Sequence, residues 1–206
     1  MMKIIQWTFV FYFLLQSCVV IENDHDYSSI NNTKINDNYT ILISNEFDDN
    51  TISWMFGSFE EWRLKTSFNY TVKIVDKNMV FDYNNINNDM YNTIFIELEL
   101  MEHIMKDGNY HLVNGFCERN KRKNNSSIKI NKSGDVWLPM NVFQSTLMHE
   151  LGHAFGMDHT DHIPSKSVLK STAQFYGRTM HVECLDAKLY CELWGCVNSC
   201  KLEQLP

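Results

Sequence analysis

The chain has 206 residues, 44% of them hydrophobic, which predicts one folded domain and excludes a wholly disordered chain. Its 18 basic and 25 acidic side chains give a net charge of −7. Because that balance is acidic and no long basic run is present, nucleic acid is not an expected partner.

The first 21 residues are the most apolar stretch. Lys3 provides a positive start, the apolar run extends to Leu15, and polar chain resumes at Glu22. This pattern is typical of a signal peptide over 1–21 and is short for a spanning helix, so we expect a secreted protein without stable membrane insertion after leader cleavage. The alternatives are an uncleaved membrane anchor and a lipidated Cys18. The polar residues 22–38 predict a flexible mature N-terminus.

Hydrophobic periodicity predicts alternating strands and helices from residue 39 onward. Met55, Phe59 and Trp62 recur at helical spacing, whereas Ile94 and Ile96 alternate with polar residues as in a strand. The predicted elements are strands over 39–44, 70–75, 92–100, 127–130 and 135–138, a loop over 77–91, and helices over 53–66, 141–155 and 179–193. This order predicts an α/β or α+β fold, with helices packed on one mixed sheet.

Six asparagines stand in N-x-S/T sequons, which predict N-glycosylation of an exported chain. An Asn-rich chain, here with 22 asparagines, also produces such matches by chance. The sequons begin at Asn31, Asn38, Asn69, Asn124, Asn125 and Asn131.

Cysteines gather near the C-terminus, which predicts a disulfide-stapled segment in an oxidising compartment. Leader removal leaves an odd set of five, so one thiol is expected to be free or to pair with another chain. A structural zinc site is the alternative, although the usual C-x2-C pair is missing. The five are Cys117, Cys184, Cys191, Cys196 and Cys200.

One motif carries chemistry: residues 149–159 match H-E-x-x-H-x-x-G-x-x-H at every specified position. On a helix, His149 and His153 lie on one face about one turn apart, so both can bind one metal ion. Gly156 can adopt a positive φ and end the helix, after which His159 supplies a third nitrogen. Three neutral imidazoles with an open fourth position predict a catalytic zinc site.

The expected reaction is hydrolysis of a peptide bond. Zinc lowers the pKa of its water and polarises the scissile carbonyl. Glu150, beside the first ligand, is the predicted catalytic residue, taking a proton as general base and returning it to the leaving amine as general acid.

This extended motif resembles that of the metzincin metallopeptidases, and the stretch from Met148 to Asp161 is most similar to the matrixin branch. The resemblance implies a mixed, mostly parallel twisted sheet with an active-site helix and a C-terminal helix. It also implies that 39–206 form a catalytic domain with a Cys-rich C-terminal segment. In this family an edge strand aligns the substrate in an extended conformation. The candidates for that strand are 127–130 and 135–138.

The chain departs from the family pattern in several places. Leu169 occupies the expected position of the methionine that forms the floor beneath the zinc, with Met180 as a distant second candidate. Thr160 replaces the serine that follows the third histidine in matrixins. The inhibitory cysteine-switch motif of the matrixins is also missing. By resemblance, residues 163–177 would form the pocket for the side chain that follows the scissile bond.

The sequence therefore predicts a secreted, monomeric zinc metalloendopeptidase that acts on extended protein or peptide substrates. The alternative is a secreted binding or decoy protein that retains the scaffold with little or no proteolytic activity. The intact Glu150 favours the enzyme, because a pure binder does not need a general base. Asp158 and Asp161 flank His159 and are candidates for orienting a ligand imidazole, or else solvated loop carboxylates.

Overall fold

A computed structural model describes residues 38–77, 92–101, 104–106, 109–111, 114–120, 124–132, 138–160, 167–170 and 181–196. The predicted leader, nearly all of the predicted N-terminal segment and most of the predicted loop over 77–91 lie outside these ranges. So does the predicted strand over 135–138, apart from Leu138, which is not in a strand.

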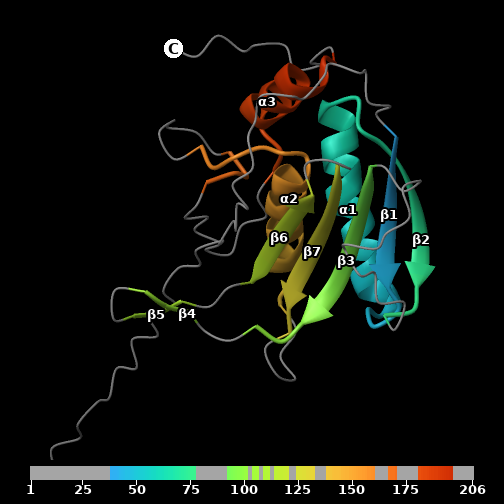
Figure 1. Cartoon of the computed structure of the whole chain (residues 1–206), viewed down its shortest axis with the longest axis vertical. Coiled ribbons are helices and arrows are strands. Elements are labelled where there is room, and N and C mark those ends of the chain that lie inside the picture. The colour runs from blue at the N-terminus through green and yellow to red at the C-terminus, as the bar shows by residue number, and fades with distance from the viewer. Residues whose placement is uncertain are drawn as a thin grey trace, which may run out of the picture.

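The centre of the fold is a five-stranded sheet with the strand order β2-β1-β3-β7-β6 (Figure 1). Four strands run parallel, and only β6 is antiparallel, to its neighbour β7. The prediction of a mixed, mostly parallel sheet is confirmed. The strands are β1 (Asn38–Ser44), β2 (Asn69–Val75), β3 (Thr93–Glu99), β6 (Gly115–Asn120) and β7 (Asn125–Asn131); β4 (Ile104–Lys106) and β5 (Asn109–His111) form a separate pair.

The prediction of the strand over 127–130 as a substrate-aligning edge strand is wrong. That segment belongs to β7, which pairs with β3 on one side and with β6 on the other, so both its backbone edges are occupied. The edge of the sheet is instead β6, a strand that the sequence did not predict.

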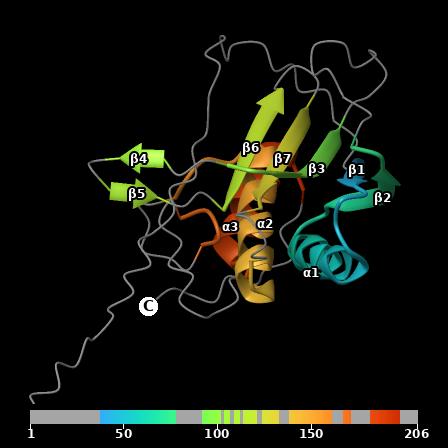
Figure 2. The same cartoon turned by 90° about the horizontal axis from the view of Figure 1, so that it is seen from below.

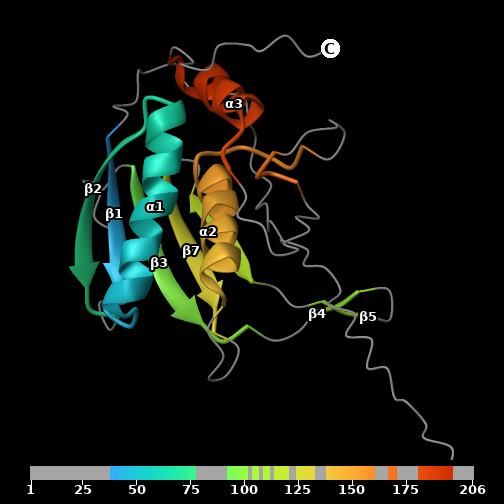
Figure 3. The ribbon, with the colours of Figure 1, turned by 180° about the vertical axis from the view of Figure 1, so that it is seen from behind.

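Two helices, α1 (Asp49–Lys65) and α2 (Met140–Ala154), cover one face of the sheet (Figures 2 and 3). The third helix, α3 (Cys184–Trp194), lies across one end of that layer. Helix α1 begins four residues earlier than predicted because Asp48 accepts a hydrogen bond from the Thr51 backbone N–H at 2.7 Å, forming an N-cap. Helix α3 begins five residues later than predicted, where Glu183 and Asp186 form a capping box.

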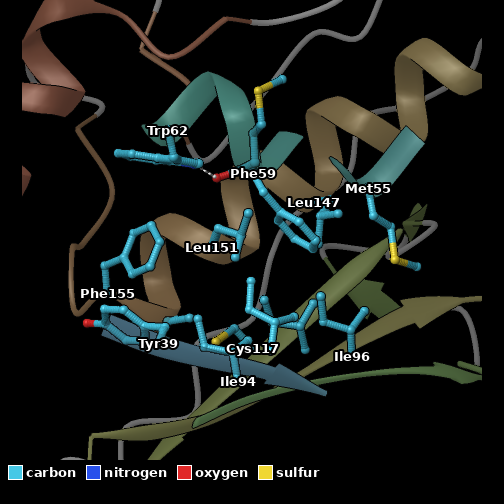
Figure 4. Packing of buried hydrophobic residues seen from close by; sticks show 14 of the residues in the cluster. Tyr39, Met55, Phe59, Trp62, Ile94, Ile96, Cys117, Leu147, Leu151 and Phe155 are labelled. Carbon is cyan, nitrogen blue, oxygen red and sulfur yellow. Dashed lines mark hydrogen bonds between the residues drawn. The ribbon is translucent and has the colours of Figure 1, made fainter. Parts of the chain in front are cut away.

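Apolar side chains from α1, α2 and the sheet form the core (Figure 4). Phe59 and Trp62 of α1 are fully buried, as is Leu151 of α2. Burial of such a side chain contributes about 1.5–3 kcal/mol. The Trp62 indole N–H also donates to the Met148 carbonyl at 3.1 Å, which ties α1 to the middle of α2. The position of α2 is therefore set from both sides.

The C-terminal cysteines form disulfides, as predicted. Cys191 and Cys196 are bonded to each other, so they are not available for the alternative zinc site, and Cys184 is also disulfide-bonded. Cys117 is the free thiol among the described residues, and it is buried in β6. Within the same ranges, no helix combines the length and the apolar character needed to cross a bilayer.

Candidate metal centre

Helix α2 and the turn after it bring the three motif histidines together. The helix ends in a Schellman motif, in which the N–H groups of Gly156 and Met157 donate to the carbonyls of His153 and Gly152 at 2.8 and 3.0 Å. Gly156 has a φ of +90°, as the sequence predicted. The turn reverses the chain and carries His159 back towards the helix.

The Nε2 atoms of the three histidines converge on one point. The separations are 3.0 Å between His149 and His153, 3.2 Å between His153 and His159, and 3.4 Å between His149 and His159. His149 and His153 are buried, and His159 is partly buried.

Backbone carbonyls determine which nitrogen of two of these rings carries the proton. Nδ1 of His149 lies 2.6 Å from the Val168 oxygen, and Nδ1 of His153 lies 2.8 Å from the Met157 oxygen. A carbonyl oxygen only accepts, so each Nδ1 donates its proton and each Nε2 keeps a lone pair. Burial lowers the pKa of His153 to about 4, with a smaller contribution from His159 outweighed by the Met157 bond, so its ring is neutral at pH 7.

This geometry fits a zinc ion. With Zn–N bonds of about 2.0–2.1 Å, tetrahedral ligand nitrogens lie roughly 3.3–3.4 Å apart, close to the separations found here. Three neutral nitrogen lone pairs at such distances repel one another unless a cation lies between them. The donor set is therefore that of a three-histidine site with an open fourth position.

Leu169 forms the floor beneath this cluster. It is fully buried, and a Cβ built on Gly152 would overlap its Cδ2 atom, so α2 and residue 169 are in close contact. The Thr160 backbone N–H donates to the Leu169 carbonyl at 3.0 Å, which joins this floor to the residue that follows His159. Leu169 thus packs beneath the site in the manner expected of the methionine that it replaces.

A buried carboxylate of α3 holds the same segment in place. Asp186 accepts hydrogen bonds from the Ser167 hydroxyl and, at 3.2 Å, from the Val168 backbone N–H. The Ser167 hydroxyl also accepts from Thr160 at 2.9 Å and from the Leu169 N–H at 3.0 Å. The Val168 carbonyl that orients His149 is therefore anchored by α3, a relationship that the sequence did not reveal.

Glu150 is buried beside the histidines, with an exposed fraction of only 1%. Its carboxylate faces the first residue of β6, because a Cβ on Gly115 would lie 3.0 Å from Glu150 Oε1 and 2.6 Å from the Thr146 methyl group. Burial, and secondarily the charge of Glu150, raise the pKa of the Cys117 thiol, which is on the same side of β6. The predicted catalytic residue therefore lies between α2 and the edge strand.

Arg119 of β6 supports the turn that carries His159. Its guanidinium lies directly against Gly156, donates to Asn124 Oδ1 at 2.8 Å, and is 6.0 Å from the centre of the Trp194 ring. The Trp194 indole N–H donates to the Phe155 carbonyl at 3.1 Å. The edge strand, the turn and α3 thus meet at one guanidinium.

Comparison with known proteins gives two likenesses of fold. Two zinc proteases or related structures align with much of this chain. High choriolytic enzyme 1, a hatching enzyme zinc-protease from the medaka fish Oryzias latipes, aligns with a TM-score of 0.41 and 14% identity, over 78% of this chain and 90% of its own. Myroilysin aligns with a TM-score of 0.45 and 10% identity, over 77% of this chain and 84% of its own. No family model matches the sequence, and no curated protein matches it. Because both likenesses are weak, we base the function on the histidine cluster.

The remaining predicted site residues have plainer positions. Asp158 is exposed, and the Nδ1 partners of His149 and His153 are carbonyls instead of carboxylates. Asp161 and Met180 lie outside the described residues, as does most of the predicted substrate pocket over 163–177. Val168 and Met157 act through their main chains, so no side-chain pattern could have identified them. The Glu-x-x-Asp spacing at the start of α3 was a usable signal for Asp186.

Proposed function

We propose that this chain is a zinc-dependent endopeptidase of the metzincin type, with most similarity to the matrixin branch. The observation that carries the proposal is the convergence of the three Nε2 atoms at 3.0–3.4 Å, with two of the rings oriented by backbone carbonyls. His149, His153 and His159 would hold the ion. When bound, zinc lowers the pKa of a water ligand and polarises a carbonyl.

Glu150 is the proposed general base. Its carboxylate is buried beside a ligand and faces β6, where an extended substrate would lie. In that position it accepts a proton from the attacking water and transfers it to the leaving amine nitrogen. Burial excludes bulk water from the carboxylate, so its proton transfers are directed to the reacting groups.

Strand β6 is the proposed substrate-aligning edge, in place of the strands favoured by the sequence. It is the antiparallel edge strand of the sheet, and its first residue contacts the side chain of Glu150. An extended peptide can add to such an edge through main-chain hydrogen bonds. Its scissile bond would then lie next to the histidine cluster.

We also propose that the protein is secreted as a monomer after removal of residues 1–21, with 39–206 as its catalytic domain. The disulfide between Cys191 and Cys196 supports an oxidising compartment.

The decisive experiment measures zinc content and peptide cleavage on the same purified protein. We expect one zinc per chain, cleavage of a peptide library near neutral pH, and loss of cleavage with a chelator. Glu150→Gln keeps the size and hydrogen-bonding capacity of the side chain, so it should retain zinc while losing at least about 100-fold in kcat. His153→Gln should lose zinc. Zinc binding without cleavage by the unaltered chain would instead support the binding or decoy protein.

A further inference from the structure

The fold separates the N-x-S/T sequons into two kinds. Among the described residues, five sequon asparagines are present. Asn124, Asn125 and Asn131 are 5%, 3% and 5% exposed, whereas Asn38 and Asn69 are exposed. A glycan is attached to the side-chain nitrogen, so burial of that nitrogen decides whether the folded protein has room for one.

The buried asparagines are engaged in the structure through their side chains. Asn124 Nδ2 donates to the Tyr39 hydroxyl at 3.1 Å and to Asn92 Oδ1 at 2.7 Å. A sugar on this nitrogen would replace one of the two hydrogens and disrupt the network.

The other two asparagines accept hydrogen bonds from the backbone of neighbouring segments. Asn125 Oδ1 accepts from the Thr93 N–H and Asn131 Oδ1 accepts from the Met101 N–H, both at 3.1 Å. A chain that carried a glycan at any of the three buried positions could not form this sheet intact.

Asn69 has the opposite environment. It is the first residue of β2, the outermost strand on the side of the sheet away from β6. Asn69 and Thr71 point to the same side of the strand, and both are exposed. In the sequon of Asn38, by comparison, Thr40 is only partly exposed.

An open hollow of about 550 Å³ lies beside Asn69. It contains the ion pair of Arg63 and Glu60 and the hydroxyl of Tyr70, which donates to Glu60 at 2.7 Å. These groups provide hydrogen-bond donors, acceptors and an aromatic ring next to the acceptor, and the hollow leaves room for the first sugar.

We propose that Asn69 is an N-glycosylation site of the exported protein, and that Asn124, Asn125 and Asn131 carry no glycan in the folded chain. The co-reactant is a lipid-linked oligosaccharide pyrophosphate. A bond forms between Asn69 Nδ2 and the anomeric carbon of the first sugar while the bond from that carbon to the phosphate oxygen breaks. The amide loses one proton to a base of the transferase, and the lipid pyrophosphate leaves.

The glycan would have a structural effect, because β2 exposes an unpaired edge of the sheet. Such an edge is a template for pairing with another chain, and proteins protect it with bulky or charged groups. A sugar at Asn69 covers the start of this edge and leaves β6 free. The proposal requires export but not peptidase activity, so the two can fail separately.

The experiment is expression of the full chain, with its own leader, in eukaryotic secretory cells. The secreted protein is treated with an amidase that releases N-glycans in heavy-oxygen water, which converts each glycosylated Asn to labelled Asp. Peptide mass spectrometry should find the label at position 69 and at none of positions 124, 125 and 131.

Two substitutions at Thr71 provide a matched pair. Thr71→Ala destroys the sequon and should remove the glycan, whereas Thr71→Ser keeps both. Asn69→Gln should behave as Thr71→Ala does. Absence of label at Asn69, whether because the chain is not exported or because the site is passed over, overturns the proposal. Label at any of the three buried asparagines of the folded, secreted protein also overturns it.

Discussion

Leu169 fills the space that a side chain on Gly152 would need, because a Cβ on Gly152 would overlap Leu169 Cδ2. Gly152 lies on α2 between His149 and His153. The two residues therefore set how closely the metal-binding helix approaches its floor, and substitutions at them should act together.

The first prediction concerns this pair. Leu169→Ala should cost about 2–5 kcal/mol of unfolding free energy through the cavity that it leaves, whereas Leu169→Met should cost less than about 1.5 kcal/mol. Gly152→Ala should be destabilising alone and partly rescued by Leu169→Ala. Urea denaturation of the two single variants and the double variant measures the coupling. Strict additivity would contradict the contact.

The second prediction concerns Asp186. Asp186→Asn replaces a charged acceptor of three hydrogen bonds, from Ser167, Val168 and Glu183, and should lower the unfolding free energy by roughly 1.5–3 kcal/mol. Because Val168 orients His149, zinc affinity should also fall, as measured by competition with a chelator. Glu192→Gln, in the exposed ion pair with Lys188 on the same helix, is the control and should change neither quantity. A loss of stability with unchanged zinc affinity would show that Asp186 does not act on the site.

The third prediction compares two glycines with positive φ. Gly156 has a φ of 90° and lies against Arg119, whereas Gly195 has a φ of 72° with no atom within 4 Å of a built Cβ. Gly195→Ala should therefore cost only the backbone term, about 1–2 kcal/mol. Gly156→Ala adds the overlap with Arg119 and should be clearly worse in both stability and zinc affinity.

Arg119→Ala provides the check on this comparison. In the Gly156→Ala background it should recover the steric part of the loss and leave the backbone part. If the two Gly→Ala variants are equally stable, the contact with Arg119 does not constrain the turn.

The fourth prediction concerns acid stability of the chelated, metal-free protein. Burial lowers the pKa of His153 from 6.5 to about 4, so between these values the unfolded chain binds more protons than the folded one. The stability from burying the neutral ring is complete above pH 6.5 and is lost as the pH falls towards 4. The full loss is on the order of 3 kcal/mol. Urea unfolding at several pH values should show this slope, and His153→Gln should flatten it.

The active-site helix was predicted to within one residue at each end, because its information is local. The i, i+4 histidines, the apolar face and Gly156 all belong to one short stretch. Strand β6 was missed because it is short and its buried positions include Gly115 and Cys117, which produce no strong alternation of apolar side chains. Without β6, β7 was interpreted as an edge.

The support of the metal centre was beyond sequence reasoning for a different reason. Asp186 bonds to a segment 18 to 19 residues earlier that has no regular secondary structure. The orienting groups of two histidines are main-chain carbonyls, which every residue has. Leu169 was identified only through its distance from the motif in a resembling family.

The anchoring of Val168 by α3 connects the metal centre to the C-terminal disulfides. Asp186 lies two residues after Cys184, and Cys191 closes the other end of the same helix through Cys196. Reduction of these bonds would loosen the element that orients His149, so metal affinity and thiol oxidation are thermodynamically linked. Linkage is reciprocal, and a bound metal ion must in turn make the cysteines harder to reduce. The redox potential of the surroundings therefore becomes a variable of the histidine site.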